Sequence, residues 1–248
     1  MQPRRKIRPL IVLAAMLCSA ATCVAQTIDL RERLAACATC HGEHGEGAGG
    51  AEFYPHLAGK PAGYLLEQMQ SFRDGRRHYP RMVYLMQYMD DAYLGEIAQW
   101  YASQPARTQR VATTISTLDP ASAARAQQLV HQGDAAAGIP ACAACHGVHL
   151  TGMEPSVPAL VGLPPDYVVA QIGGWRTGVR ASIAPDCMAD IARQLSPGDI
   201  RIMATWLSEQ NVAADQRPAP AGSWPLPADC GHLRADAASV PDDADVRP

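Results

Sequence analysis

Cys37-Ala38-Thr39-Cys40-His41 is the stretch of this sequence that decides its fold, and the chain contains it twice. The second copy, Cys142-Ala143-Ala144-Cys145-His146, begins 105 positions further on. Each copy places two thiols two residues apart, with a His directly after the second thiol. Structural zinc needs four ligands close together, whereas these copies are far apart in the chain and each has its own His. A thioredoxin-like dithiol lies in a βαβ setting, and neither copy is surrounded by a β-rich pattern.

The pattern C-x-x-C-H is the one by which haem c is attached to a polypeptide. Each thiol adds to one vinyl group of the haem, and the His becomes the proximal ligand of the iron. We therefore expect two covalently attached haem c groups, with zinc binding and dithiol chemistry as the alternatives. The residues expected to hold the haems are Cys37, Cys40, Cys142 and Cys145, and those expected to bind iron from the proximal side are His41 and His146.

The similarity between the two halves continues well beyond the motifs, which indicates a tandem duplication. Two small insertions or deletions change the offset from 105 to 103 near Pro55 and to 106 near Met82. Pairs at the offset of 103 include Pro55 with Pro158, Tyr64 with Tyr167, Gln68 with Gln171, Arg73 with Arg176 and Arg77 with Arg180.

Apolar residues at helical spacing predict an all-α fold. No segment has the alternation typical of strands. The first of the expected helices in each half runs into its C-x-x-C-H motif. The expected helices span residues 28–40, 64–73 and 90–103 in the first half and 121–132, 167–175 and 196–209 in the second.

A haem iron with His on one side commonly takes Met sulfur on the other, which raises its reduction potential. Met82 and Met188 correspond to each other at the offset of 106, whereas the other methionines of the first half have counterparts without sulfur. We therefore expect Met82 and Met188 to be the distal ligands, both in a loop before the last helix of their half. Met86 and His78 lie close by and are the alternatives at the first site.

Two further sets of repeated residues have expected roles around the haems. A carbonyl in the loop at Pro55 or Pro158 can accept the free Nδ1–H of the proximal His and fix its orientation. The arginines of the middle helix are either solvated or paired with haem propionates. These arginines are Arg73, Arg77, Arg176 and Arg180.

The N-terminus has the features of a secretory signal peptide, which we expect to end near Ala25. A basic start precedes an apolar run from Leu10 to Leu17, which is too short to span a membrane. Lipidation of Cys23 is an alternative. We expect a periplasmic protein with no transmembrane segment in its mature chain. Removal of the signal leaves 17 of the 21 basic residues against 24 acidic ones, a net charge near −7 that disfavours nucleic-acid binding.

Cys187 and Cys230 are the only cysteines left once the signal and the two motifs are set aside. Export places them where disulfides persist, so we expect a bond between them. Such a bond would lay the C-terminal tail over the distal side of the second haem and hold the segment of Met188 in place. The alternatives are a buried hydrophobic Cys187 and a free thiol at Cys230.

In the order of its motifs the chain resembles the dihaem cytochrome c4 family, which consists of tandem class I cytochrome c domains. The shared pattern is C-x-x-C-H-G, a Pro-x-Leu-x-Gly turn, Tyr with Gln four residues on, Phe/Trp-Arg-x-Gly-x-Arg, then Met and a helix. The departures are Cys187, the long tail with Cys230, and a total of only two lysines. With this resemblance, the expected parts are a signal at 1–25, a first cytochrome c domain at 26–104, a linker at 105–120, a second domain at 121–211 and a Pro/Ala/Asp-rich tail at 212–248.

The resemblance implies a periplasmic carrier of single electrons, with two His/Met-ligated haems and no enzymatic activity of its own. The implied partners are redox proteins: a donor dehydrogenase or respiratory complex, and an acceptor oxidase or reductase. One alternative is a cytochrome subunit of a periplasmic dehydrogenase or oxidase. A dihaem peroxidase is the other, but it would need an iron with an open sixth position, and the paired methionines argue against that.

Overall fold

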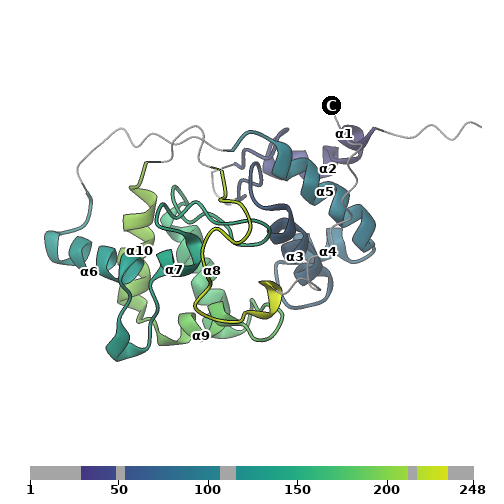
Figure 1. The fold of residues 1–248 in the computed structure, drawn as a ribbon. Helices are drawn as coiled ribbons and strands as arrows, with labels where there is room; N and C mark the ends of the chain where they lie inside the picture. Colours follow the sequence, from purple (N-terminus) through teal and green to yellow (C-terminus); the bar gives the residue numbers. More distant parts are fainter. Residues whose placement is uncertain (1–28, 49–53, 107–115, 212–216, 234–248) are drawn as a thin grey trace, which may run out of the picture. The chain divides into compact units, whose positions relative to one another are not determined.

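The computed structural model describes residues 29–48, 54–106, 116–211 and 217–233. The described residues divide at Leu34 into two units, and both C-x-x-C-H motifs lie in the second (Figure 1). Within the described part of the chain no helix has the length and apolarity to cross a membrane. The helices are α1 Leu30–Arg33, α2 Ala35–His41, α3 Ala62–Arg73, α4 Pro80–Met86, α5 Asp91–Ser103, α6 Pro120–His131, η1 Ala135–Ala137, α7 Cys142–His146, α8 Pro165–Thr177, α9 Cys187–Gln194, α10 Pro197–Ser208 and η2 Gly231–Leu233.

The fold is all-α, as predicted, and the described residues form only isolated β-bridges instead of strands. Helices α3, α5, α8 and α10 agree with the sequence prediction to within a few residues. Caps explain where two of them begin. The side chain of Asp90 accepts a hydrogen bond from the backbone N–H of Tyr93, and that of Ser196 accepts one from Asp199. Such capping satisfies backbone donors that the first turn leaves unpaired.

The helix predicted at the start of the first half is wrong in its extent, and the one at the start of the second half has the predicted extent but does not continue into its motif. In the first half the chain forms two short helices, α1 and α2, instead of one helix over 28–40. In the second half α6 ends at His131 and does not run into the motif, which has its own short helix α7. Gly133, with a φ of 75°, follows the end of α6 and adopts a conformation that ends a helix readily.

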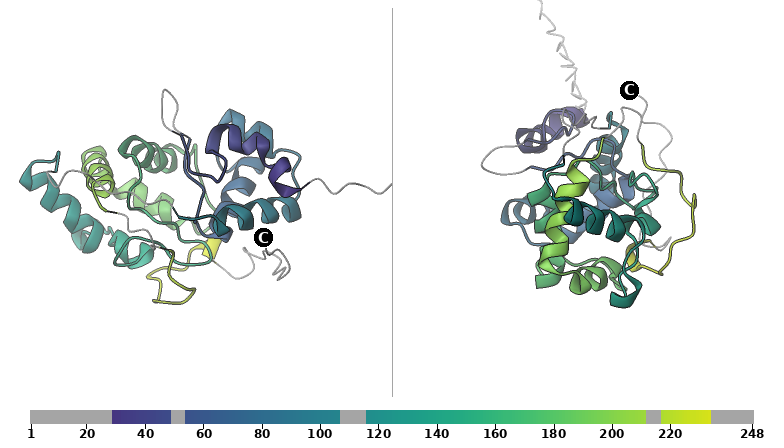
Figure 2. Two further views of the ribbon diagram at one scale, coloured as in Figure 1. Left: turned by 90° about the horizontal axis from the view of Figure 1, so that it is seen from above. Right: turned by 90° about the vertical axis from the view of Figure 1, so that its left-hand side faces the viewer.

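Each half has a core made by its last helix. In the first half α5 packs against α3, with Leu94 and Ala98 fully buried. In the second half α10 packs against both α6 and α8 (Figure 2), around Leu129 and Met203. In the first half α4 lies against α3, and in the second half α7 lies against α6 and α9 against α8.

The two halves meet within residues 34–248 through residues that correspond in the repeat. The guanidinium of Arg77 donates to the side-chain oxygens of Gln68, at 3.1 Å, and Gln171, at 2.6 Å. Arg180 donates to the same two oxygens, at 2.8 Å each. Backbone hydrogen bonds from His78 to Val179 and from Ala181 to Arg76 flank this cluster. Each arginine thus binds the glutamine of its own half and that of the other half.

Candidate haem sites

Each C-x-x-C-H motif ends a short helix on its histidine, and the histidine is buried. His41 closes α2 and His146 closes α7, each with 8% of its surface exposed. The glycine that follows has a positive φ, 85° at Gly42 and 83° at Gly147. This conformation strains a residue with a side chain but not glycine, so the chain can leave the helix directly after the histidine.

The Nδ1 atom of each motif histidine faces a proline carbonyl, as predicted. The distance is 2.8 Å from His41 to the oxygen of Pro55 and 2.7 Å from His146 to that of Pro158. A carbonyl oxygen can only accept, so Nδ1 carries the proton and Nε2 keeps its lone pair. Burial lowers the pKa of both imidazoles below the ordinary value. Both rings are therefore neutral near pH 7, which is the form that binds a metal.

The four motif cysteines are free of disulfides and only partly exposed. Burial raises the pKa of the thiols of Cys37 and Cys145, and raises that of Cys142 to about 11. Thiols that stay protonated make poor dithiol nucleophiles. Among the described residues no group of three or more His, Cys, Asp or Glu side chains could hold a metal ion. The geometry therefore favours neither dithiol exchange nor a site built from protein ligands alone.

A cavity adjoins the second motif and contains the groups that a haem c needs. Cys142, Cys145 and His146 line one part of it, and Met188 of α9 lines another. The rest of the lining includes apolar residues of α8 and α10, among them Ile172 and Met203. Two thiols, an imidazole with a free Nε2 and a thioether around one apolar cavity are the donor set of a His/Met haem c, so the residues present fit that group.

The two candidate distal methionines lie on short helices, not in loops as the sequence analysis expected. Met82 is in α4, which begins at Pro80, and Met188 is in α9, which begins at Cys187. Both side chains are half-buried. Met86, the alternative at the first site, is 2% exposed and belongs to the hydrophobic core.

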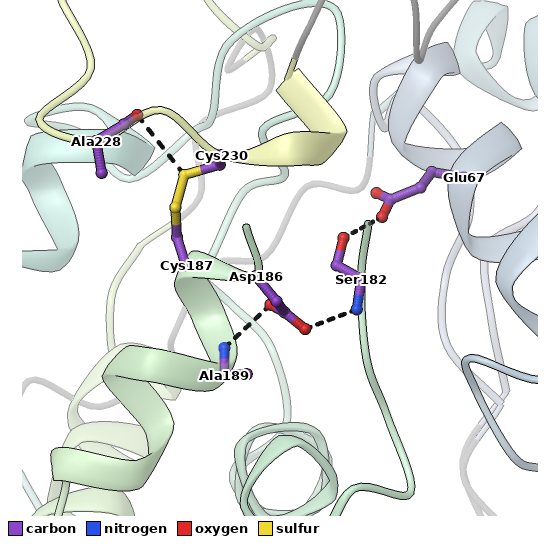
Figure 3. The surroundings of a disulfide bond; sticks show 7 residues. All are labelled: Glu67, Ser182, Asp186, Cys187, Ala189, Ala228 and Cys230. Atoms are coloured by element: carbon purple, nitrogen blue, oxygen red, sulfur yellow. Dashed lines mark hydrogen bonds between the residues drawn. A yellow bond between two sulfur atoms is a disulfide. The ribbon is translucent and has the colours of Figure 1, made fainter. Parts of the chain in front are cut away.

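The predicted disulfide between Cys187 and Cys230 is present, with Cα atoms 5.6 Å apart (Figure 3). Cys187 is the residue before Met188. Asp186 caps α9 by accepting from the N–H of Ala189, at 3.1 Å, and also accepts from that of Ser182, at 2.6 Å. The bond and the cap together hold the start of α9, and with it Met188.

The described part of the tail, residues 217–233, contacts the second half at further points. The indole N–H of Trp224 donates to the carbonyl of Cys145, at 3.2 Å. Its ring lies so close to Gly147 that a Cβ there would come within 2.6 Å of it. Ala219 exchanges backbone hydrogen bonds with Gly152 and Glu154. The tail thus contacts both the motif helix α7 and, through the disulfide, helix α9.

The four repeated arginines separate into two pairs with different surroundings. Arg73 donates to the carbonyl of Met89, and Arg176 to that of Leu195, so this pair ties the middle helix to the segment before the last helix. Arg77 and Arg180 form the cluster between the halves instead. Lys60 lines the second cavity beside Arg180 and was not among the predicted site residues. The signal in the sequence was that the chain has only one other lysine, Lys6.

Comparison with known proteins places this geometry in a family. A family model described as cytochrome c matches residues 32–107. The chain is 33% identical to a thiosulfate dehydrogenase electron acceptor of Thiomonas intermedia, over 72% of this chain and 80% of the relative. It is 32% identical to cytochrome c4 of Pseudomonas aeruginosa, over 71% and 84% of the two chains.

The fold is also similar to that of a solved structure, the reduced cytochrome c4 of Pseudomonas stutzeri. The TM-score is 0.60 at 28% sequence identity, over 72% of this chain and 95% of that one. The two C-x-x-C-H helices, the all-α fold and these relatives agree with one another. The chain belongs to the cytochrome c4 family, and it is a dihaem electron-transfer cytochrome with two covalently bound haem c groups.

Proposed function

We propose that this protein is a periplasmic carrier that takes up and passes on single electrons and turns over no substrate of its own. In this proposal Cys37 and Cys40 hold the first haem, and His41 and Met82 bind its iron. The observation that carries the proposal is the orientation of the motif histidines. A carbonyl fixes Nδ1 of each ring, which leaves Nε2 as the only nitrogen with a free lone pair.

At the second site the same roles belong to Cys142, Cys145, His146 and Met188. The haem supplies the one-electron chemistry when bound. The polypeptide holds the ligands and keeps water away. The apolar residues around Met188 make the cavity a low-dielectric environment, and the proline carbonyl strengthens the proximal imidazole as a donor. A thioether ligand in such a cavity favours the reduced iron.

Export and domain boundaries complete the proposal. We infer that residues 1–25 direct export and are removed, and that residues 26–104 and 121–211 each fold around one haem. The linker at 105–120 and the tail at 212–248 lie in part outside the described residues. The described portion of the tail is held by Cys187 and Trp224, which supports a structural role for it.

A second candidate function concerns the electron donor. One relative is named for accepting electrons from thiosulfate dehydrogenase, so a periplasmic dehydrogenase that oxidises a sulfur compound is a candidate partner. In this role the protein would be either a free acceptor or a bound subunit. Purification of the native complex without detergent distinguishes the two, because only a subunit co-elutes with its dehydrogenase.

The main proposal is tested by a redox titration of the purified holoprotein, followed by absorption and electron paramagnetic resonance. We expect two one-electron steps, both with the spectra of low-spin His/Met haem. Stopped-flow mixing with a reduced thiosulfate dehydrogenase should then show electron uptake without a further substrate. A bis-His spectrum at either site, or a site that titrates without Met ligation, would contradict the ligand assignment.

A further inference from the structure

The region between the two halves buries more positive than negative charge. Lys60 is 7% exposed and Arg180 is 6% exposed. Lys60 is also the only lysine beyond the proposed signal peptide, since the one other lysine is Lys6. Burying an ammonium group is expensive unless an anion pairs with it. A solitary lysine in the interior therefore needs an explanation.

The protein groups around these two cations do not neutralise them. Arg180 donates to the amide oxygens of Gln68 and Gln171, which are neutral, and its guanidinium lies 3.8 Å from the ring centre of Trp175. Within the described chain no carboxylate forms an ion pair with Lys60 or Arg180. Burial, and to a lesser degree the neighbouring Arg180, lowers the pKa of Lys60.

The nearest buried carboxylate belongs to Glu67, which is 6% exposed. It is already engaged, because it accepts from the amide of Gln68, at 3.3 Å, and from the hydroxyl of Ser182 (Figure 3). Even with Glu67 ionised, the two guanidinium groups of Arg77 and Arg180 and the ammonium of Lys60 leave an excess of positive charge. An anion beside Lys60 would keep its amine protonated and would balance this charge.

These two cations and a neighbouring indole line the cavity of the second haem site. Lys60, Arg180 and Trp175 share this cavity with His146 and Met188. The indole N–H of Trp175 is buried and has no acceptor in the described structure. Two cations and an orphaned N–H around one cavity form a receptor for carboxylate. The two propionates are the carboxylates that a haem c brings.

The repeat shows that the fold itself does not require these donors. At the offset of 103 the counterpart of Lys60 is Leu163, and that of Trp175 is Phe72. Leu163 lies in the hydrophobic core of the second half, and Phe72 is buried in the first. The same structural positions are therefore filled by apolar residues, so the fold does not require a buried ammonium group at Lys60.

We propose that Lys60, contributed by the first half, forms an ion pair with a propionate of the second haem and raises the reduction potential of that haem relative to the first. The proposal rests on the proposed haem ligands. Reduction adds an electron, so a fixed positive charge nearby stabilises the reduced state more than the oxidised one. Lys60 thus shifts the distribution of electrons between the two haems towards the second haem.

The decisive variant is Lys60→Gln in the holoprotein, with both midpoint potentials measured by spectroelectrochemical titration. We expect one of the two midpoint potentials to fall by about 59 mV. This shift corresponds to about a tenfold change in the equilibrium constant for electron transfer between the haems. Lys60→Arg should keep most of the wild-type value, since it keeps the charge. Arg201→Gln, at an exposed position of α10, is the control for a general charge effect and should change neither midpoint.

The haem that responds is identified in a Met82→His background, in which the first haem should titrate separately at a lower potential. The shift caused by Lys60→Gln should then remain in the other haem. A shift confined to the first haem, equal shifts in both, or no shift in either would overturn the proposal. If Met82→His does not separate the two steps, the assignment of Met82 as a ligand is contradicted. The effect of Lys60 is still tested in that case, because Lys60→Gln alone shows whether one midpoint potential moves.

A second measurement does not depend on the potentials. Lys60 should resist acetylation by an amine-reactive ester in the native holoprotein and react after denaturation, as peptide mapping would show. Rapid acetylation of the native protein would contradict the burial of a paired ammonium group. This test uses the wild-type chain, so it can overturn the proposal even if the neutral variants do not fold.

Discussion

A single hydrogen bond on each motif histidine determines what the other nitrogen of the ring can do. The oxygen of Pro55 or Pro158 accepts a hydrogen bond from Nδ1–H, and burial keeps the ring neutral. The repeat alone predicted this contact, since a proline recurs at the same place in both halves. In both halves this proline lies in a loop, where the side chain of the histidine can reach its carbonyl.

The methionines provide the first prediction. Met82→Ala or Met188→Ala should each remove about half of the weak far-red band that arises from sulfur-to-iron charge transfer in the ferric protein, and the double variant should remove it all. Met86→Ala is the matched control. Its side chain is fully within the core, so this change should lower stability by roughly 2–5 kcal/mol and leave the band intact. Loss of the first site's band in Met86→Ala would show that the repeat offset identified the wrong sulfur.

Lys60 shows the limit of single-residue reasoning. A lone lysine after Gly59, in a loop, is ordinarily exposed, and nothing in the local sequence indicates otherwise. It becomes buried only because the second half covers it with Arg180 and Tyr167. The sequence of one half therefore cannot predict this part of the site, although the repeat shows that Leu163 occupies the corresponding position.

Among the elements that the sequence did not predict are the two short helices α4 and α9. They have seven and eight residues, which is too few for a helical pattern of apolar residues to be recognised. Their start signals were present, with Pro80 at the first turn of α4 and Asp186 before α9. The longer helices were predicted because three or more turns repeat the helical spacing of apolar residues. Their capping residues, such as Asp90 and Ser196, are also visible in the sequence.

The disulfide at the start of α9 leads to the second prediction. Cys187→Ser, compared with the double variant Cys187→Ser/Cys230→Ser to exclude effects of a free thiol, should loosen the segment before Met188. The second haem should then bind added cyanide faster and titrate at a lower potential, while the first haem stays unchanged. Ligand-binding kinetics and a redox titration measure both effects. Unchanged kinetics at the second haem in both variants would show that the cap by Asp186 suffices to hold α9.

Arg125 of α6 connects three elements and makes the third prediction. Its guanidinium bonds to Asp199 of α10, at 3.1 Å, and pairs with Asp134, before η1, at 2.9 Å. The hydrogen bond from Arg125 lowers the pKa of Asp134 below the ordinary value of 3.8. A carboxylate with a lowered pKa contributes stability above its unfolded pKa and loses that contribution as the pH falls through its folded pKa.

Arg125→Met should therefore lower the melting temperature of the holoprotein near pH 7, by roughly 2–4 °C since the pair is partly exposed. The difference from wild type should shrink as the pH is lowered from 5 to below about 3. Thermal unfolding followed by circular dichroism at several pH values measures it, with Arg201→Met as the control on the exposed side of α10. A difference that is the same at pH 7 and pH 3 would mean that Arg125 acts through packing rather than charge.

At the scale of the whole molecule, the tandem repeat brings corresponding residues into contact with one another. Gln68, Arg77, Gln171 and Arg180 come from equivalent positions of the two halves and form one cluster. The repeat offset predicted the equivalence, but it could not predict the contact, because a linker allows many arrangements of two domains. The cluster ties two haem sites within one compact unit, which suits the passage of electrons between them.

The last prediction separates a carrier from a peroxidase, the alternative that also uses two haems c. A peroxidase must open the sixth position of one iron to peroxide. Here Met188 and the fixed imidazole of His146 line the same cavity, and the helix of Met188 is held by a disulfide and a capping carboxylate. Both irons should therefore be six-coordinate and low-spin when oxidised, when half-reduced and when fully reduced.

Absorption and electron paramagnetic resonance at controlled potentials measure the spin states, and peroxide consumption is assayed on the same samples. Cys187→Ser is an internal comparison, since a loosened Met188 should raise any peroxide reaction above that of the wild type. A high-spin haem in the half-reduced wild-type protein, together with rapid peroxide consumption, would move this chain from electron carriers to enzymes.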